Sequence, residues 1–182
     1  MLEYDNVIRL MFEISKRSGR QKPLKNEDVI SLFDSYADDL YRFAVSFVQS
    51  KHDAEDVVQD VFLKLLSKKV LLDKRFEKAY LMSMTANKCK DLLKSSARKT
   101  SVDLESNEWQ LQYYEGFSDH NKEVFDELMR LEDTYRVPIY LAYYEGYSYK
   151  EISKILDISE SAVGMRIKRG KEQLKIKLEE ES

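Results

Sequence analysis

The sequence predicts an all-α protein made of two small helical domains joined by a flexible acidic linker, with a helix-turn-helix in the second domain. Three observations predict this fold. The 182 residues include only five glycines and two prolines, too few turn formers for a many-stranded sandwich or barrel. Apolar residues recur at helical spacing. Two basic stretches, 87–99 and 164–178, flank an acidic stretch at 101–119, which indicates separate charged surfaces.

Composition excludes several classes of protein. Hydrophobic residues make up 43% and charged residues 35%, a balance that predicts a folded chain. Cys89 is the single cysteine, so no intramolecular disulfide forms, and with His52 and His120 it makes no metal-ligand pattern. We therefore expect no metal and no cofactor. The sequence has neither a run of about 18 apolar residues nor a signal-peptide layout, so we expect a cytoplasmic protein without membrane contact.

The first domain is predicted at residues 28–95. It follows an N-terminal extension, 1–27, that combines a short apolar helical stripe with a basic hinge. The first helix of the domain is expected to end near 49–52, and its inward stripe consists of Val29, Phe33, Tyr36, Leu40, Ala44 and Phe47. Asp53 is expected to cap the second helix, with Glu55 and Asp56 in its first turn. The inward residues of this second helix are Ala54, Val57, Val58, Val61 and Leu65. A loop at 71–75 leads to a third helix at about 76–95.

Residues 96–120 lose helical periodicity and gather serine, asparagine, glutamine and acidic residues, which is typical of an exposed linker. Four aromatic residues within it either pack on a domain or contact a partner: Trp109, Tyr113, Tyr114 and Phe117. The second domain, 121–182, begins with a helix through Phe125, Leu128 and Leu131. In the next helix, from about Thr134 to Tyr144, Pro138 predicts either a kink or a late start.

A helix-turn-helix is predicted near the end of the chain. Ser148 and Glu151 form a capping box, and a tight turn precedes a second cap at Ser159. The final helix turns Val163, Ile167 and Leu174 inward and presents a basic front. That front consists of Arg166, Lys168, Arg169 and Lys171. It suits a major groove, although a helical bundle with a solvated basic face is the alternative.

These residues also carry a family resemblance. The run 53–65 resembles the region 2.2 signature of bacterial sigma factors, and Asn87 with Asp91 resembles the Asn-xxx-Asp pattern of the DNA-reading helix that follows. The segments 144–152, 159–163 and 166–169 are similar to region 4. The three matches occur in the same order as in the family and span residues 28–178. This chain lacks the domains that other sigma factors carry between regions 2 and 4. The chain therefore resembles the extracytoplasmic-function class of sigma factors, which are transcription initiation factors and not enzymes.

The resemblance implies partners and sites. Asp56, Gln59 and Asp60 fall where the family binds the clamp of the largest polymerase subunit, and the second domain is expected near the flap. Residues expected at the −10 element are Lys74, Arg75, Asn87, Lys88, Lys90, Asp91 and Lys94, with Asn87 reading a flipped base. Residues expected at the upstream duplex are Ser159, Ser161, Met165, Arg166, Lys168, Arg169 and Lys171. An anti-sigma factor is a further possible partner.

Departures from the family pattern bear on promoter reading. Gly164, Met165 and Gly170 replace residues that often offer polar groups or favour the helix, so weak reading of the −35 element is expected. The N-terminal extension is additional. It either caps the first domain or, like the linker, docks a separate targeting protein. The main alternative function is a stand-alone helix-turn-helix regulator, which would bind duplex DNA tightly without polymerase.

Overall fold

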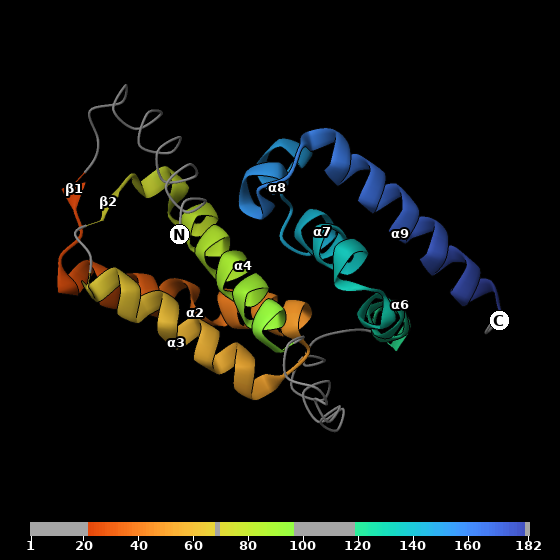
Figure 1. Ribbon diagram of the computed structural model, residues 1–182, viewed down its shortest axis with the longest axis horizontal. Coiled ribbons are helices and arrows are strands. Elements are labelled where there is room, and N and C mark those ends of the chain that lie inside the picture. Colours follow the sequence, from red (N-terminus) through yellow and green to blue (C-terminus); the bar gives the residue numbers. More distant parts are fainter. Residues whose placement is uncertain (1–21, 68–69, 97–118, 181–182) are drawn as a thin grey trace.

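The computed structural model describes residues 22–67, 70–96 and 119–180, and within them the fold is all-α, as predicted (Figure 1). Expectations for the helix of the N-terminal extension and for the acidic linker fall outside the described residues. The helices are α2 (Asn26–Val48), α3 (Lys51–Ser67), α4 (Glu77–Ser96), α6 (Asp119–Arg130), α7 (Asp133–Tyr143), α8 (Tyr149–Leu156) and α9 (Glu160–Glu180). We call α2, α3 and α4 the first domain, and α6, α7, α8 and α9 the second.

α2 and α3 form a helical hairpin connected by two residues. Gln49 adopts the left-handed conformation (φ 56°) and ends α2. The Ser50 hydroxyl accepts a hydrogen bond from the backbone N–H of Asp53, at 3.2 Å. Ser50 therefore caps α3, and the prediction that Asp53 does so is wrong. The left-handed residue reverses the chain early, so α3 begins at Lys51 and Asp53 lies in its first turn.

The inward face of α2 is rotated slightly from the predicted stripe. Leu32 is buried, whereas Phe33 is 48% exposed and packs edge-on against Phe62, with ring centroids 5.0 Å apart. The prediction that Phe33 faces the core is wrong. Residues 32 and 33 are both compatible with the apolar spacing, and the packing of α2 against α3 and α4 selects Leu32.

A short two-stranded ladder ties the basic hinge to the loop before α4. β1 (Lys22–Pro23) pairs antiparallel with β2 (Leu71–Leu72), and the backbone N–H of Leu24 donates to the Val70 carbonyl at 3.0 Å. A 3₁₀ turn, η1 (Lys74–Phe76), follows and leads directly into α4. Strands of two residues leave no periodic signal, so the sequence alone predicts only a hinge and a loop here.

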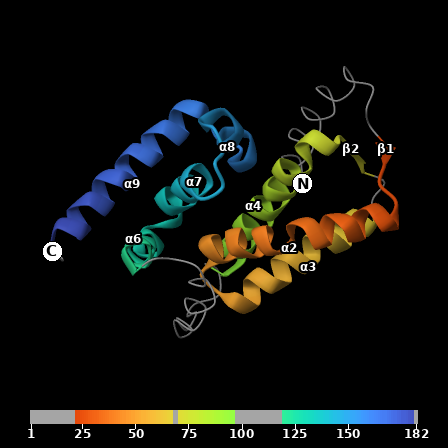
Figure 2. The ribbon, with the colours of Figure 1, turned by 180° about the vertical axis from the view of Figure 1, so that it is seen from behind.

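The second domain follows its local sequence signals. α7 begins at Asp133 and contains Pro138, so the late-start alternative is wrong. The capping box of Ser148 and Glu151 is confirmed, with the Glu151 carboxylate accepting from the Ser148 N–H at 2.9 Å. Asp157 ends α8 in the left-handed conformation (φ 52°), and Ser159 caps α9. The predicted helix-turn-helix is therefore present as α8 and α9 (Figure 2).

Gly170 allows α9 to pack closely against α7. A Cβ at this position would lie 2.5 Å from Ile139 Cδ1 and 3.1 Å from Tyr135 Cβ. Gly170 is therefore buried on the inward face with Val163 and Ile167, and it does not belong to the DNA-facing front. The interpretation of Gly170 as a weakness in promoter reading is wrong, because this glycine serves helix packing.

Gly170 and Gly164 form a matched pair for testing this packing. Inside a helix, alanine is about 1 kcal/mol better than glycine. A Cβ at 164 would lie 3.7 Å from the Tyr149 ring, an ordinary contact, so Gly164→Ala is expected to raise the free energy of unfolding by about 1 kcal/mol. At 170 the crowding against α7 is expected to cancel or reverse that gain. Urea denaturation measures both, and equal gains would contradict the close packing of α7 and α9.

Candidate functional site

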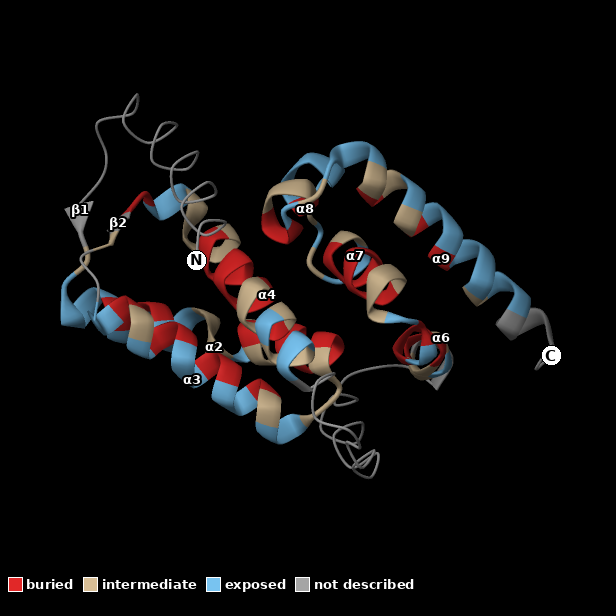
Figure 3. Cartoon of the chain, in the orientation of Figure 1, coloured by how far each residue is buried: buried red, intermediate tan, exposed pale blue. Residues whose placement is uncertain are grey.

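An exposed ridge runs along α3 on the side away from the core. The predicted residues Asp56, Gln59 and Asp60 all lie exposed on it, one helical turn apart. The ridge continues into two exposed leucines, Leu63 at 54% and Leu66 at 49%. Figure 3 shows α3 with alternating buried and exposed faces. The ridge thus has a polar half and an apolar half, which suits contact with another protein.

The apolar half of the ridge was not predicted from the sequence. On α2, Ile30 (61% exposed) and Phe33 add further apolar surface, and Phe33 reaches α3 through Phe62. A signal was present, because Leu63 and Leu66 follow Asp56 and Gln59 at helical spacing and cannot share the buried face of Val61 and Leu65. Apolar residues on an otherwise polar helix face indicate a partner surface.

A pocket between α3 and α4 brings two predicted sites together. Asp56 and Asp60 from α3 and Lys88 and Asp91 from α4 line it. The Lys88 ammonium lies 2.6 Å from the Asp60 carboxylate, and His52 Nδ1 lies 3.4 Å from the Asp56 carboxylate. Residues expected at the polymerase clamp and residues expected at the −10 element therefore line the same pocket. Because Lys88 and Asp60 are both about half exposed, their bridge adds little stability and is available for exchange with other charges.

The remaining −10 candidates on α4 point in different directions. Asn87 is half-buried, whereas Asp91 and Lys94 are exposed. Lys90 donates a hydrogen bond from its ammonium to the carbonyl of Leu156, at the end of α8. In this arrangement, α4 therefore presents Lys88 and Asp91 toward α3 and Lys90 toward the second domain.

A buried carboxylate holds Arg75, one of the two −10 candidates in the turn before α4. Asp73 is 3% exposed and accepts hydrogen bonds from Arg75 through Nε at 3.1 Å and a terminal nitrogen at 2.7 Å. Arg75 also lies over the Phe76 ring, 5.4 Å from its centroid, and Lys74 is exposed beside it. Hydrogen bonding to Asp73 raises the pKa of the Arg75 guanidinium. About 15 Å of helix separates the start of α4 from Asn87, so the loop and Asn87 lie at different levels along a bound strand.

Most of the predicted front of α9 is exposed, and three of the predicted upstream residues already have partners within the protein. Ser159 and Ser161 serve the helix start: the Ser159 hydroxyl accepts from the Ala162 N–H at 3.2 Å and lies 3.1 Å from the Ser161 hydroxyl. Lys171 donates to the Tyr143 hydroxyl at 3.0 Å and lies over the same ring. The outward side chains that can meet a groove are Met165, Lys168 and Arg169, with Arg166 half-buried at the edge.

The described ranges 22–67, 70–96 and 119–180 hold no group of three or more histidine, cysteine or acidic residues placed to bind a metal ion. Cys89 is buried, and burial raises the pKa of its thiol well above the ordinary value. None of the described helices is long and apolar enough to cross a membrane.

Two family models match the chain. The model described as Sigma-70 region 2 matches residues 32–99, and the one described as Sigma-70, region 4 matches residues 122–174. The first match holds the α3 ridge and all of α4, and the second holds α8 and the part of α9 that carries its front. The two surfaces built above from geometry thus fall inside the two matched regions.

Relatives and solved structures agree with these matches. The ECF RNA polymerase sigma factor SigM of Bacillus subtilis is 26% identical over 148 residues, covering 79% of this chain and 91% of SigM. SigX of the same organism is 26% identical over 159 residues, covering 81% and 82%. The sigma factor RpoE in complex with the anti-sigma factor NepR from Bartonella quintana superposes with a TM-score of 0.59 at 20% identity, covering 84% and 95%. CnrH in complex with the cytosolic domain of CnrY gives 0.60 at 25%, covering 87% and 92%.

Proposed function

Because the chain belongs to the extracytoplasmic-function sigma factors, which direct transcription initiation, we propose that it binds core polymerase through α3 and promoter DNA through α4 and α9. The observation that carries the proposal is the exposed ridge of α3, on which Asp56, Gln59 and Asp60 continue into Leu63 and Leu66. Such a ridge suits a partner with matching basic and apolar surface. The polymerase, and not this chain, supplies the bond-forming chemistry.

At the −10 element we propose that α4 holds a melted single strand. Asn87 offers both a donor and an acceptor to one base, and the exposed Lys94 offers charge to the phosphates. Lys88 can exchange its surface bridge with Asp60 for a phosphate. Unstacking costs about 1.4 kcal/mol per step, so base capture and phosphate contacts together must offset it. Lys74 and Arg75 lie in η1, before the start of α4, and are proposed to contact neighbouring nucleotides.

The direct test of the proposed function is reconstitution of transcription. Purified chain is mixed with core polymerase from its host and with promoter fragments, and run-off transcripts are measured. Promoter-specific transcripts that require the chain are the expected result. Tight duplex binding by the chain alone, with no effect on polymerase, would support the stand-alone helix-turn-helix regulator instead.

The affinity of α9 for upstream DNA is expected to fall steeply as the salt concentration rises and to depend little on the DNA sequence. Gly164 offers no side chain to a base, and even an added Cβ there would face the ring of Tyr149 at 3.7 Å. Met165 is 51% exposed but carries no hydrogen-bond donor and only a weakly accepting sulfur. Lys168→Ala is expected to weaken upstream contacts about equally on intact and scrambled −35 sequences and to reduce the salt slope by roughly one. Holoenzyme titration at two salt concentrations measures this effect.

Met165→Ala is the matched variant on the same face of α9. Loss of a true base contact costs roughly 1 to 3 kcal/mol on the intact site only. If Met165→Ala or Lys168→Ala abolishes a strong preference for one upstream sequence, α9 reads bases and the argument from Gly164 fails.

Regulation by a protein partner is also proposed. RpoE and CnrH were solved with NepR and with the cytosolic domain of CnrY, and we propose that an anti-sigma factor controls this chain as well. Docking of a targeting protein on the N-terminal extension or the linker remains a prediction, because those segments lie outside the described residues.

A further inference from the structure

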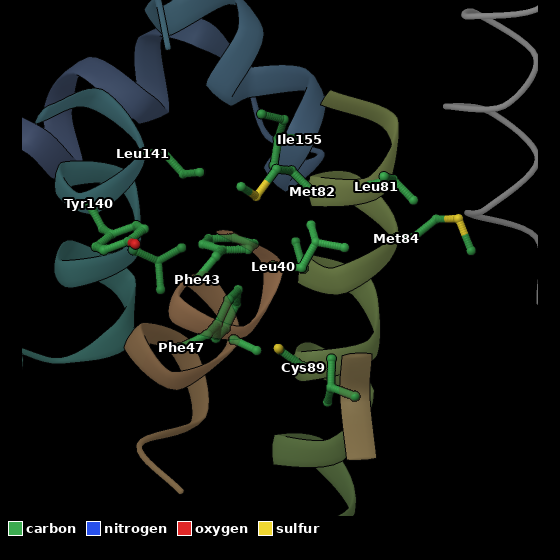
Figure 4. Close-up of a cluster of buried hydrophobic side chains, with 14 of the residues drawn as sticks. Leu40, Phe43, Phe47, Leu81, Met82, Met84, Cys89, Tyr140, Leu141 and Ile155 are labelled. Carbon is green, nitrogen blue, oxygen red and sulfur yellow. The ribbon is translucent and has the colours of Figure 1, made fainter. Parts of the chain in front are cut away.

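The last turn of α7 places two tyrosines in opposite surroundings. Tyr140 is 2% exposed and stacks on Phe43 of α2, with ring centroids 6.1 Å apart. Figure 4 shows Tyr140 among the buried apolar side chains beside Phe43. Tyr143, three residues later, is 59% exposed. Burial in the core therefore explains the first tyrosine but not the second.

Lys171 of α9 contacts Tyr143 on the surface of the second domain. Its ammonium donates a hydrogen bond to the Tyr143 hydroxyl at 3.0 Å and lies 5.3 Å from the centroid of the ring. Lys171 is itself exposed, so solvent reaches both side chains. The hydrogen bond raises the pKa of Lys171, and the ammonium is therefore charged at neutral pH. We call Tyr143 and Lys171 the Tyr–Lys pair.

Gly170 brings α7 close enough to α9 for this contact. Ile139 and Tyr135 of α7 pack directly over Gly170, where a Cβ would lie 2.5 Å and 3.1 Å from them. Tyr143 lies one turn beyond Ile139 on the same side of α7, and Lys171 directly follows Gly170. The close packing of the two helices therefore also positions the Tyr–Lys pair.

The Tyr–Lys pair offers hydrogen-bond donors to an anion from two side chains at once. A lysine ammonium carries three protons, of which one is directed at Tyr143, and a tyrosine hydroxyl that accepts a hydrogen bond keeps its own proton to donate. The nitrogen and oxygen atoms are 3.0 Å apart, which suits two oxygens of one phosphate. Because Lys171 is already held by Tyr143, its binding to a phosphate orders fewer torsions than binding by an unrestrained surface lysine.

The Tyr–Lys pair borders the predicted DNA-facing front of α9. Lys168 precedes Lys171 by three residues, so the two lysines lie along one side of the helix, and both are exposed. When a recognition helix enters a groove, side chains at its edge meet phosphates, and tyrosine and lysine are both common phosphate donors. The position and chemistry of the pair therefore match a backbone phosphate.

We propose that the Tyr–Lys pair is a phosphate-binding site for the backbone of the upstream duplex, with Tyr143 of α7 as a DNA contact outside the helix-turn-helix. The inference rests on the proposed function and adds to it a residue from outside α8 and α9. Tyr143 supplies a neutral donor, whereas Lys171 supplies the charge. This difference separates the two residues in an experiment.

Salt dependence measures the two contributions. Replacing a lysine that contacts a phosphate reduces the salt slope by roughly one, because one fewer counterion is released, whereas loss of a neutral hydroxyl leaves the slope unchanged. Lys171→Ala is therefore expected to reduce the slope for holoenzyme binding to promoter DNA by roughly one. Tyr143→Phe keeps the ring and removes the hydroxyl. It is expected to weaken binding by about fivefold at every salt concentration, with a nearly unchanged melting temperature.

Tyr144→Phe is the matched control at the next position. The Tyr144 ring packs against Tyr140 and Phe125, so loss of its hydroxyl is expected to change neither the affinity nor the salt slope. A second measurement locates the phosphate. Single methylphosphonates, each of which removes the charge of one phosphate, are placed in turn along the upstream duplex. One position is expected to weaken binding by the wild type and to have no further effect in Lys171→Ala.

The outcomes separate this inference from the proposed function. Unchanged affinity in Tyr143→Phe, together with the expected loss in Lys168→Ala, would overturn the phosphate site and leave upstream binding by α9 in place. Loss of core-polymerase binding without DNA in Tyr143→Phe would also overturn it, because the pair would then contact protein. If Lys168→Ala and Lys171→Ala both bind promoters like the wild type, the upstream part of the proposed function itself fails. A loss at constant slope in Tyr143→Phe, with one methylphosphonate position silenced in Lys171→Ala, supports the site.

Discussion

Replacing Arg136 with methionine is expected to lower the free energy of unfolding by at least about 3 kcal/mol. Arg136 is 4% exposed, and its guanidinium donates to four backbone carbonyls. These belong to Ser46 (2.6 Å), Phe47 (3.1 Å), Met129 (3.2 Å) and Leu131.

The physical reason is the position of these carbonyls at helix ends. Ser46 and Phe47 lie in the last turn of α2, and Met129 and Leu131 lie at the end of α6. Such carbonyls have no partner within their own helix, and a cation is favoured there. Methionine keeps the volume but takes this donor away from the Ser46, Phe47 and Leu131 carbonyls, at about 1 to 3 kcal/mol for each acceptor left unsatisfied. The Met129 carbonyl still accepts from the Gln49 side-chain amide. Burial lowers the pKa of Arg136 to about 10, so the guanidinium is still charged at neutral pH.

Guanidinium denaturation of wild type, Arg136→Met and Arg42→Met measures the effect. Arg42 lies exposed on α2, and its replacement is expected to change stability by less than about 0.5 kcal/mol. The loss of stability in Arg136→Lys is expected to lie between those of Arg42→Met and Arg136→Met, because one ammonium cannot reach carbonyls spread over two helices. A loss below about 1 kcal/mol in Arg136→Met would show that water satisfies the carbonyls and that the arginine is not a structural cap.

Alanine at Gln59 and Asp60 together is expected to weaken association with core polymerase by at least about 100-fold. Both side chains are exposed on α3, so the melting temperature is expected to stay nearly unchanged. The bridge that Asp60 forms with Lys88 is about half exposed and adds roughly 0 to 1 kcal/mol at most. Association is measured by fluorescence anisotropy of labelled protein, and melting by circular dichroism.

The apolar half of the ridge is expected to behave in the same way. Leu63→Glu places a charge where Leu63 is now 54% exposed, which the free protein tolerates but an apolar partner surface does not. Glu132→Ala, on the second domain, serves as the control. Parallel loss of melting temperature and of core binding in the α3 variants would indicate a structural role for the ridge and contradict the proposed interface.

The sequence alone determined the helices and most of their ends. Apolar spacing, the capping box at Ser148 and the short turn before Ser159 are local signals, and each acts within one or two helical turns. They were enough to predict the all-α fold, the helix-turn-helix, and the exposure of the polar ridge residues and of Lys168. The family resemblance followed from the same short motifs.

Only the tertiary structure decided which face of each helix meets another helix. Spacing alone could not choose Leu32 over Phe33, or show that Gly170 is required by Ile139 and Tyr135. Nothing in the sequence around Arg136 indicates that two of its four carbonyl partners, those of Ser46 and Phe47, lie about ninety residues away. The same holds for the packing of the two domains, where the bridge from Lys78 to Glu145 joins distant segments. Many arrangements of the same helices have nearly equal local energies, and the close packing of their surfaces against one another selects one of them.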